Sequence, residues 1–186
     1  GNYLQNLLHG NLGVSLIYTS RSVNQFIADG FPISARLGIQ ALLVAIPIGI
    51  FLGTVAALCR GKWQDSLSMV ISTLGVSVPS FVLSSFLQYF FCILTPLLPI
   101  ARWGGFEHTI LPTLALAALP TAFIARLTRS NMVEVLQQDY IRTALAKGLP
   151  LFRIACTHGL RNALLPVITY LGPVATQILT GSFMVE

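Results

Sequence analysis

The sequence has 186 residues, of which 54% are apolar and only 9% are charged. Soluble globular domains carry roughly 25% charged residues, so this composition argues against a soluble domain and indicates a membrane protein. The 11 Lys and Arg against 6 Asp and Glu give a net charge of +5. These charges are too few to form a nucleic-acid-binding stripe, so we expect no nucleic-acid partner.

Residues 1–30 precede the first long apolar run and contain Asn, Gly and Ser throughout. We expect them to form an extracytoplasmic segment, followed over 31–186 by a membrane domain. The chain opens at Gly1 without a Met, a basic region or a signal cleavage site, and it stops at Glu186 directly after an apolar run. We therefore expect it to be a fragment of a longer protein.

Four long stretches of the chain carry no Asp, Glu, Lys or Arg: 37–59, 66–101, 108–125 and 162–185. A membrane-spanning helix needs roughly 20 apolar residues, because it rises about 1.5 Å per residue through a hydrocarbon layer of about 30 Å. The second stretch is too long for one span, and its tail Pro96-Leu97-Leu98-Pro99 breaks the helix. We predict four spans, at about 37–59, 67–94, 109–127 and 163–184, with the second one long and tilted.

Lys and Arg are unevenly distributed between the loops that join these spans. The loops 60–65 and 126–161 hold Arg60, Lys62, Arg126, Arg129, Arg142, Lys147, Arg153 and Arg161. The other side of the membrane keeps only Arg21, Arg36 and Arg102. By the positive-inside rule, the two basic loops face the cytoplasm, and the loop around Trp103 lies outside.

The predicted spans hold no residue typical of an ion-coupled carrier or an enzyme. Such carriers usually place ionisable side chains at membrane depth, and these spans contain no Asp, Glu, Lys or Arg. The chain has no HExxH or GxSxG motif and no GxxxxGK[ST] phosphate loop, and its His and Cys residues are scattered singly. We therefore predict no catalytic residue, no metal site and no ATP site. An ion-coupled carrier with ionisable groups in further spans stays the alternative.

Prolines and small residues recur within the predicted spans. The prolines are Pro47, Pro79, Pro112, Pro120, Pro166 and Pro173, and each tends to kink its helix. The patterns Gly49-x-x-x-Gly53 and Ser80-x-x-x-Ser84 allow helix backbones to approach closely. We interpret them as helix-packing sites within one bundle, with a subunit interface or a polar translocation face as the alternative. Kinked helices with small polar residues favour a moving transport pathway over a static anchor.

The cytoplasmic loop over about 128–161 carries an amphipathic pattern. Its apolar stripe consists of Val133, Leu136, Tyr140 and Ala144, at helical spacing. Gly148 stands where a left-handed C-terminal cap is expected, Pro150 follows, and a second short helix can begin at Leu151. We predict a helix–turn–helix at the cytoplasmic face. It is interpreted as a docking element for a cytoplasmic partner, and an interfacial lipid-binding helix is the alternative.

Residues 139–173, DYIRTALAKGLPLFRIACTHGLRNALLPVITYLGP, resemble the signature loop of ABC-importer membrane subunits, EAA-x3-G-x9-I-x-L-P. Arg142-Thr143-Ala144 occupies the EAA positions, Gly148 matches the glycine, and His158-Gly159-Leu160-Arg161 stands in place of I-x-L-P. FPISARLG, GVSVPSFVL and IARLTRSNMVEVL are similar to the same subfamily. The chain thus resembles the first permease subunit of the oligopeptide, dipeptide and nickel importers.

This resemblance implies an all-α polytopic type-1 ABC importer transmembrane domain in a bacterial inner membrane. Six spans are expected in the family, so the four here are the second to the fifth. The implied partners are a homologous second permease, two cytoplasmic ATPase subunits that bind ATP and Mg²⁺, and an extracytoplasmic substrate-binding protein. The implied cargo is an oligopeptide or dipeptide, with nickel or another small solute as the alternative.

The resemblance also assigns the docking of an ATPase subunit to the loop around Gly148. The residues of this coupling loop are Asp139, Tyr140, Arg142, Thr143, Ala144, Lys147, Gly148, Leu149, His158 and Arg161. ATP-driven closure of the ATPases is expected to move this loop, and the kinked spans then rock between outward and inward openings.

Overall fold

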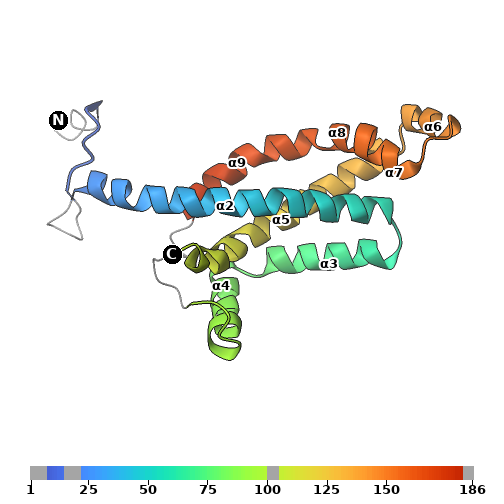
Figure 1. The fold of residues 1–186 in the computed structure, drawn as a ribbon. Helices are drawn as coiled ribbons and strands as arrows, with labels where there is room; N and C mark the ends of the chain where they lie inside the picture. The colour runs from blue at the N-terminus through green and yellow to red at the C-terminus, as the bar shows by residue number, and fades with distance from the viewer. Residues whose placement is uncertain (1–7, 15–21, 100–104, 182–186) are drawn as a thin grey trace.

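The computed structural model describes residues 8–14, 22–99 and 105–181 (Figure 1). Arg21, Arg102 and Trp103 therefore lie outside the described residues. Over the described ranges the elements are helices, apart from one isolated bridge between Val14 and Ser22. They are α2 (Val23–Leu58), α3 (Trp63–Ser77), α4 (Ser80–Gln88), the π-helix η1 (Tyr89–Leu94), α5 (Glu107–Val135), α6 (Asp139–Ala146), α7 (Leu151–Ile154), the π-helix η2 (Ala155–Gly159), α8 (Leu160–Ala163) and α9 (Leu165–Gly181).

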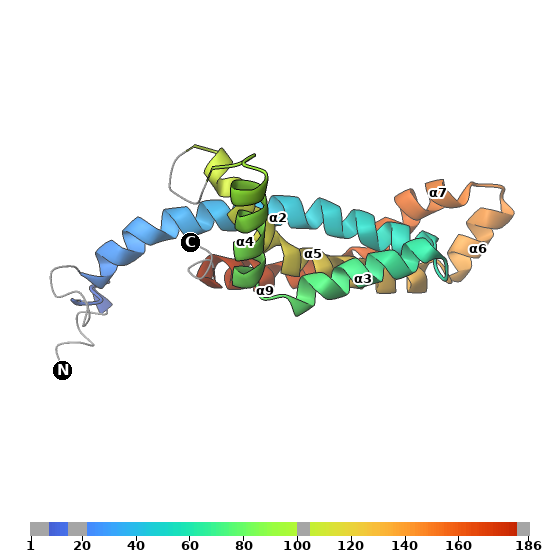
Figure 2. The same cartoon turned by 90° about the horizontal axis from the view of Figure 1, so that it is seen from below.

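The long helices form an elongated bundle around α5. Figures 1 and 2 show α2, α3, α5 and α9 running lengthwise along one another, and α5 contacts α2, α3, α4, α8 and α9. The turn between α2 and α3 and the short helices α6 and α7 lie at one end of the bundle. The beginning of α2 lies at the opposite end. The two basic loops of the sequence are thus at the same end of the molecule.

The helix α2 begins well before the charge-free stretch that predicted it. Ser22 and Gln25 form a capping box: the Ser22 Oγ accepts from the Gln25 backbone N–H at 3.3 Å, and the Gln25 Oε1 accepts from the Ser22 N–H at 3.3 Å. A helix starts where its free N–H groups are capped, not where charges end. The helix therefore carries Asp29 and Arg36 and includes the last residues of the segment predicted as 1–30.

The predicted single helix over 67–94 is wrong, because the structure breaks it into α3 and the α4–η1 arm, which are bent by 101°. Val78 has an extended backbone (φ −96°, ψ 120°), as the residue before a proline prefers. Pro79 has no N–H to continue the ladder of α3. The arm ends at Leu94, where the Pro96–Pro99 segment was expected to stop the helix.

Length and composition qualify two described helices, α2 and α5, as candidate membrane spans. The bent pair of α3 and the α4–η1 arm makes a third if it is counted as one span, and α9 contributes a shorter apolar stretch over Leu165–Ile178. The four spans therefore remain a prediction.

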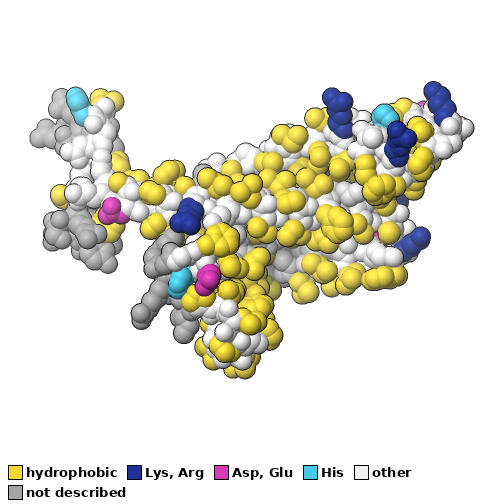
Figure 3. All heavy atoms as spheres, viewed as in Figure 1, with side chains coloured by type: hydrophobic (Ala, Val, Ile, Leu, Met, Phe, Trp, Pro, Cys, Tyr) yellow, Lys and Arg dark blue, Asp and Glu magenta, His cyan; other side chains and the backbone are white. Residues whose placement is uncertain are grey.

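Many of the buried side chains inside the bundle are small, and many large apolar side chains lie on its surface. Ala41, Ala45 and Ala125 are fully buried, whereas Leu43 and Phe51 on α2 are 68% and 66% exposed. Figure 3 shows hydrophobic side chains over the surface of the long helices, and Lys and Arg side chains mostly at the end that carries α6. Because lipid tails are apolar, a membrane protein can expose large apolar side chains and reserve small ones for helix contacts.

Candidate functional site

The loop between α5 and α9 does not begin as the sequence pattern predicted. The stripe from Val133 to Ala144 was expected to lie on one helix, but α5 ends at Val135 and α6 begins at Asp139. The N–H groups of the two intervening glutamines, Gln137 and Gln138, donate to carbonyls three residues back at 3.1 Å, and Gln138 then turns to an extended backbone. The spacing of apolar residues alone could not reveal this turn, because the turn breaks the helix without changing the helical spacing of the apolar residues.

Gly148 ends α6 in the left-handed conformation that the sequence predicted, with φ of +81°. Its N–H donates to the Leu145 carbonyl at 2.9 Å, and the Leu149 N–H donates to the Ala144 carbonyl at 3.3 Å. These two bonds make a Schellman motif, which satisfies the last carbonyls of the helix. Pro150 then caps α7, which begins at Leu151 as predicted. A β-carbon on Gly148 meets no atom within 4 Å, so the turn faces open space.

The coupling loop combines buried anchors with an exposed apolar surface. Ile141 on α6 and Ile154 on α7 are fully buried. The exposed apolar side chains, which we call the α6–α7 apolar surface, are Tyr140, Leu145, Leu149, Leu151 and Phe152. Phe152 is the most open of them, at 71%. An exposed apolar patch beside charged groups is typical of a contact surface for a protein or a membrane.

Charged residues surround this surface. Arg142 lies 3.7 Å from Asp139 in an exposed pair within α6, and the Thr143 hydroxyl donates to the Asp139 carbonyl at 2.9 Å. Lys147 is exposed at the end of the helix. Among the described residues, the structure thus brings Asp139 through Leu149 together on α6 and its cap.

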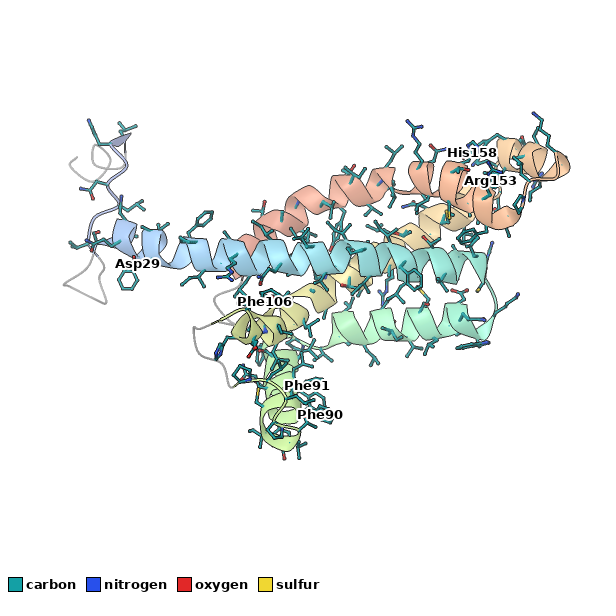
Figure 4. All side chains as sticks on the ribbon, viewed as in Figure 1. Asp29, Phe90, Phe91, Phe106, Arg153 and His158 are labelled. Carbon is teal, nitrogen blue, oxygen red and sulfur yellow. The ribbon has the colours of Figure 1, made fainter. Side chains whose placement is uncertain are left out.

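His158 and Arg161 lie further along the chain, on η2 and α8. Both are exposed, and Figure 4 places His158 and Arg153 at the same end of the bundle as α6. They occupy the segment that returns from the loop to α9. Asn162 is a residue that the sequence analysis missed: its Nδ2 donates to the Tyr140 hydroxyl at 2.9 Å and joins α8 to α6.

The Gly49 and Gly53 pair lies where α2 meets α5. A β-carbon on Gly49 would lie 2.8 Å from the Ile124 side chain, and one on Gly53 would lie 2.5 Å from the Ala125 carbonyl oxygen. Only glycine fits such an approach of two backbones. Gly75 on α3 makes a similar approach to α5, because a β-carbon on it would lie 3.1 Å from the Ala118 carbonyl oxygen. No small residue stands four positions before or after Gly75, so the sequence pattern did not identify it.

Pro79, Ser80 and Ser84 lie at and after the bend. Ser84 is buried, and Ser80 borders a small cavity of about 110 Å³. The other residues that line this cavity are largely apolar and include Leu116, Pro120, Tyr170, Val174 and Gln177. The cavity places Ser80 beside α5 and α9, and the part of Pro79, Ser80 and Ser84 in a translocation pathway stays a prediction.

Two polar contacts tie α3 to α5, and the one at Asp65 lies at the start of α3, near the end that carries the loop. Asp65 accepts from Arg129 through both carboxylate oxygens, and the Arg126 guanidinium donates to the Thr73 hydroxyl at 2.9 Å. The partners in each contact are more than 50 positions apart in the sequence, and no local pattern could have identified them. The described residues include no group of three or more His, Cys, Asp or Glu placed to hold a metal ion.

Residues 45–186 match the family described as the binding-protein-dependent transport system inner membrane component. The chain belongs to this family. Its membership confirms the expected all-α type-1 ABC importer transmembrane domain and a place in the inner membrane.

Permeases of this family from several bacteria are similar to the chain along its whole length. It is 49% identical over 184 residues to the dipeptide transport system permease protein DppB of Bacillus subtilis, covering 99% of this chain and 60% of the relative. It is 43% identical over 187 residues to the oligopeptide transport system permease protein OppB of Escherichia coli K12, covering 100% and 61%. It is 40% identical over 184 residues to DppB of Lactococcus lactis, covering 99% and 61%. The chain thus spans about three fifths of the length of these curated relatives.

Proposed function

We propose that the protein containing this chain is the transmembrane permease subunit of an ATP-driven importer of dipeptides or oligopeptides. The observation that carries the proposal is the identity to dipeptide and oligopeptide permeases over almost the whole chain. The exposed large apolar side chains of α2, α3 and α4 are consistent with a subunit that lies in lipid and against other helices.

ATP hydrolysis belongs to other subunits in this proposal. The chain contains no GxxxxGK[ST] loop that could hold ATP phosphates, so ATP and Mg²⁺ are bound by two cytoplasmic ATPase subunits. A homologous second permease completes the membrane part, and an extracytoplasmic binding protein delivers the peptide. This chain then forms part of the path of the peptide through the membrane and transmits the motion of the ATPase subunits, and it is not itself an enzyme.

The α6–α7 apolar surface is the proposed contact with an ATPase subunit. It lies at the end of the bundle with the larger share of Lys and Arg, which the positive-inside rule assigns to the cytoplasm (Figure 3). The Schellman turn at Gly148 leads from α6 to the exposed Leu149, and a β-carbon on Gly148 would meet no atom within 4 Å. Movement of the docked ATPase is transmitted to the long helices through this loop.

The bend at Val78–Pro79 is the proposed place where the helices change direction during alternating access. The α3 side of the bend is tied to α5 by the Asp65–Arg129 pair, whereas the α4–η1 arm leaves the bundle at a large angle (Figure 1). A hinge absorbs motion where a few residues join two rigid parts.

Reconstitution of the full-length protein tests the function directly. The complex is purified in mild detergent with the subunits that accompany it, placed in proteoliposomes, and supplied with the binding protein and a labelled dipeptide. We expect ATPase subunits in the purified complex and peptide uptake that stops without ATP. Uptake that requires an ion gradient and no ATP, or uptake of Ni²⁺ in place of peptide, would contradict the proposal.

A further inference from the structure

The helix α6 is joined to the rest of the protein by few contacts. It packs on α7, where Ile141 and Ile154 are both fully buried. Its other described side-chain link runs to α8: the Asn162 amide donates to the Tyr140 hydroxyl at 2.9 Å, across 22 positions of sequence. The position of α6 therefore depends on the segment that follows it, more than on α5, which precedes it.

The segment after α6 is in turn fixed to the end of α5. Met132, Ala155, Ala163 and Ala57 form a buried cluster that joins α5, η2, α8 and α2. Gly159 lies directly against Met132, because a β-carbon on this glycine would be 2.9 Å from the Met132 Cε. Both residues are buried, so the backbone at Gly159 packs directly on the Met132 side chain of α5. This cluster makes η2 and α8 part of the rigid bundle.

These contacts form one continuous route from the loop to the long helices. It runs from Tyr140 on α6 to Asn162 on α8, and from the neighbouring Gly159 to Met132 on α5. The first link is exposed and polar, whereas the second is buried and apolar. The exposed link is therefore the part of the route that a substitution can remove without opening the core.

We propose that Asn162 is a positioning residue for energy coupling: its bond to Tyr140 holds α6 on α8, so that a displacement of α6 moves α5. This inference rests on the proposed function, because it takes α6 to be the element that an ATPase subunit moves. In this proposal Asn162 acts through Tyr140 and α6, and not on ATP or peptide directly. Its effect is on the fraction of ATP hydrolysis that results in transport.

The variants Asn162→Ala and Tyr140→Phe each remove this bond, and Tyr140→Phe keeps the aromatic ring on the apolar surface. A solvent-exposed hydrogen bond contributes little to folding, so both variants are expected to fold. Loosening α6 leaves the ATPase bound but makes its motion less effective. We expect the number of peptides imported per ATP to fall about two- to tenfold in each single variant, and the double variant to be no worse than either single one.

Thr157→Val is the matched control. The Thr157 hydroxyl donates to the Arg153 carbonyl four residues back at 2.6 Å, so this change also removes one exposed hydrogen bond, but one that stays within the consecutive helices α7 and η2 and does not reach α6. We expect it to leave the number of peptides imported per ATP unchanged.

The experiment uses the reconstituted complex of the full-length protein and records ATPase co-purification, ATP hydrolysis and dipeptide uptake. Asn162→Ala should retain the first two and lose part of the third. A wild-type ratio of uptake to hydrolysis in Asn162→Ala, an equal loss in Thr157→Val, or loss of the ATPase subunits from Asn162→Ala would overturn the inference alone. A wild-type complex without ATPase subunits or ATP-driven peptide uptake would overturn the proposed function, and the inference with it.

Discussion

Asp65 on α3 and Arg129 on α5 form a bidentate ion pair. The Arg129 Nε lies 2.6 Å from the Asp65 Oδ1, and its Nη2 lies 2.8 Å from the Oδ2. The backbone N–H of Gly61 also donates to the Asp65 Oδ2, at 3.1 Å. The Asp65 side chain is only 8% exposed, so its charge depends on these donors in place of water. The pair fixes the turn before α3 onto the last turns of α5.

We expect Asp65→Asn to lower the free energy of unfolding by about 2 kcal/mol, because the change leaves a partly buried guanidinium without its counter-charge. Thermal unfolding of the purified full-length protein, followed by loss of the monodisperse peak, measures the change. Arg142→Gln serves as the control, since its pair with Asp139 is exposed and long at 3.7 Å. Equal midpoints for Asp65→Asn and the wild type would show that the pair does not hold α3 to α5.

Gly53 lies against the backbone of α5. A Gly53→Val side chain would collide with the Ala125 carbonyl oxygen and with the Thr128 Cβ, at 2.5 and 2.6 Å from the β-carbon position. Because backbone atoms of α5 cannot turn aside, we expect α2 and α5 to separate, with a loss of roughly 1–3 kcal/mol in the free energy of unfolding. Gly172→Ala on α9 meets no atom within 4 Å, and alanine favours the helix, so this variant should not lower the unfolding midpoint. A midpoint shift of the same size in both variants would contradict the close-packing account.

Glycine and proline positions in the sequence predicted the turns and helix ends that depend on local backbone chemistry. Gly148 and Pro150 determine the turn after α6, and Pro79 is the residue at which the second predicted span breaks. The size of that bend could not be predicted, because Pro47 and Pro112 have the same local chemistry and remain inside continuous helices. What differs is the packing around each proline.

The contacts that join distant elements could not be predicted from the chain. In the sequence, Asp65 and Arg129 look like ordinary loop charges, and Arg129 is one of the basic residues that indicate the cytoplasmic side. Gly159 was read only as part of a family motif, and its approach to Met132 depends on how α8 returns to α5. The turn at 136–138 was also hidden, because the helical spacing of apolar residues continues across it. Val133 and Leu136 pack against the cluster around Met132, whereas Tyr140 belongs to α6.

Pro79→Ala tests whether proline chemistry holds the bend. Alanine restores an N–H and allows Val78 to become helical, so we expect α3 and the α4–η1 arm to straighten in part. Spin labels at Leu67 and Ile93, both exposed on opposite sides of the bend, report the change as a longer or broader distance distribution. Pro112→Ala, inside the continuous α5, should leave that distribution as it is in the wild type. An unchanged distribution in Pro79→Ala would mean that packing against α5 determines the angle.

Gly148→Val tests the turn that presents α6. At φ of +81° a β-branched residue costs about 1–2 kcal/mol or more, although no neighbouring atom obstructs it. We therefore expect normal membrane insertion, a displaced α6, and at least a fivefold loss of ATPase co-purification. Gly105→Val is a suitable control, because this glycine has no positive φ and also meets no atom within 4 Å. Wild-type ATPase association in Gly148→Val would show that the turn at Gly148 is not needed for docking.

A photo-crosslink tests most directly whether the α6–α7 apolar surface docks an ATPase subunit. A benzophenone amino acid replaces Phe152 on this surface in the full-length protein, and a second variant carries it at Phe90 on the η1 arm, away from the loop end (Figure 4). We expect irradiation of membranes to link position 152 to an ATPase subunit, and position 90 to give no such product. Crosslinking of position 152 to lipid alone, in membranes where the ATPase subunits are present, would contradict this docking and identify the loop as an interfacial helix.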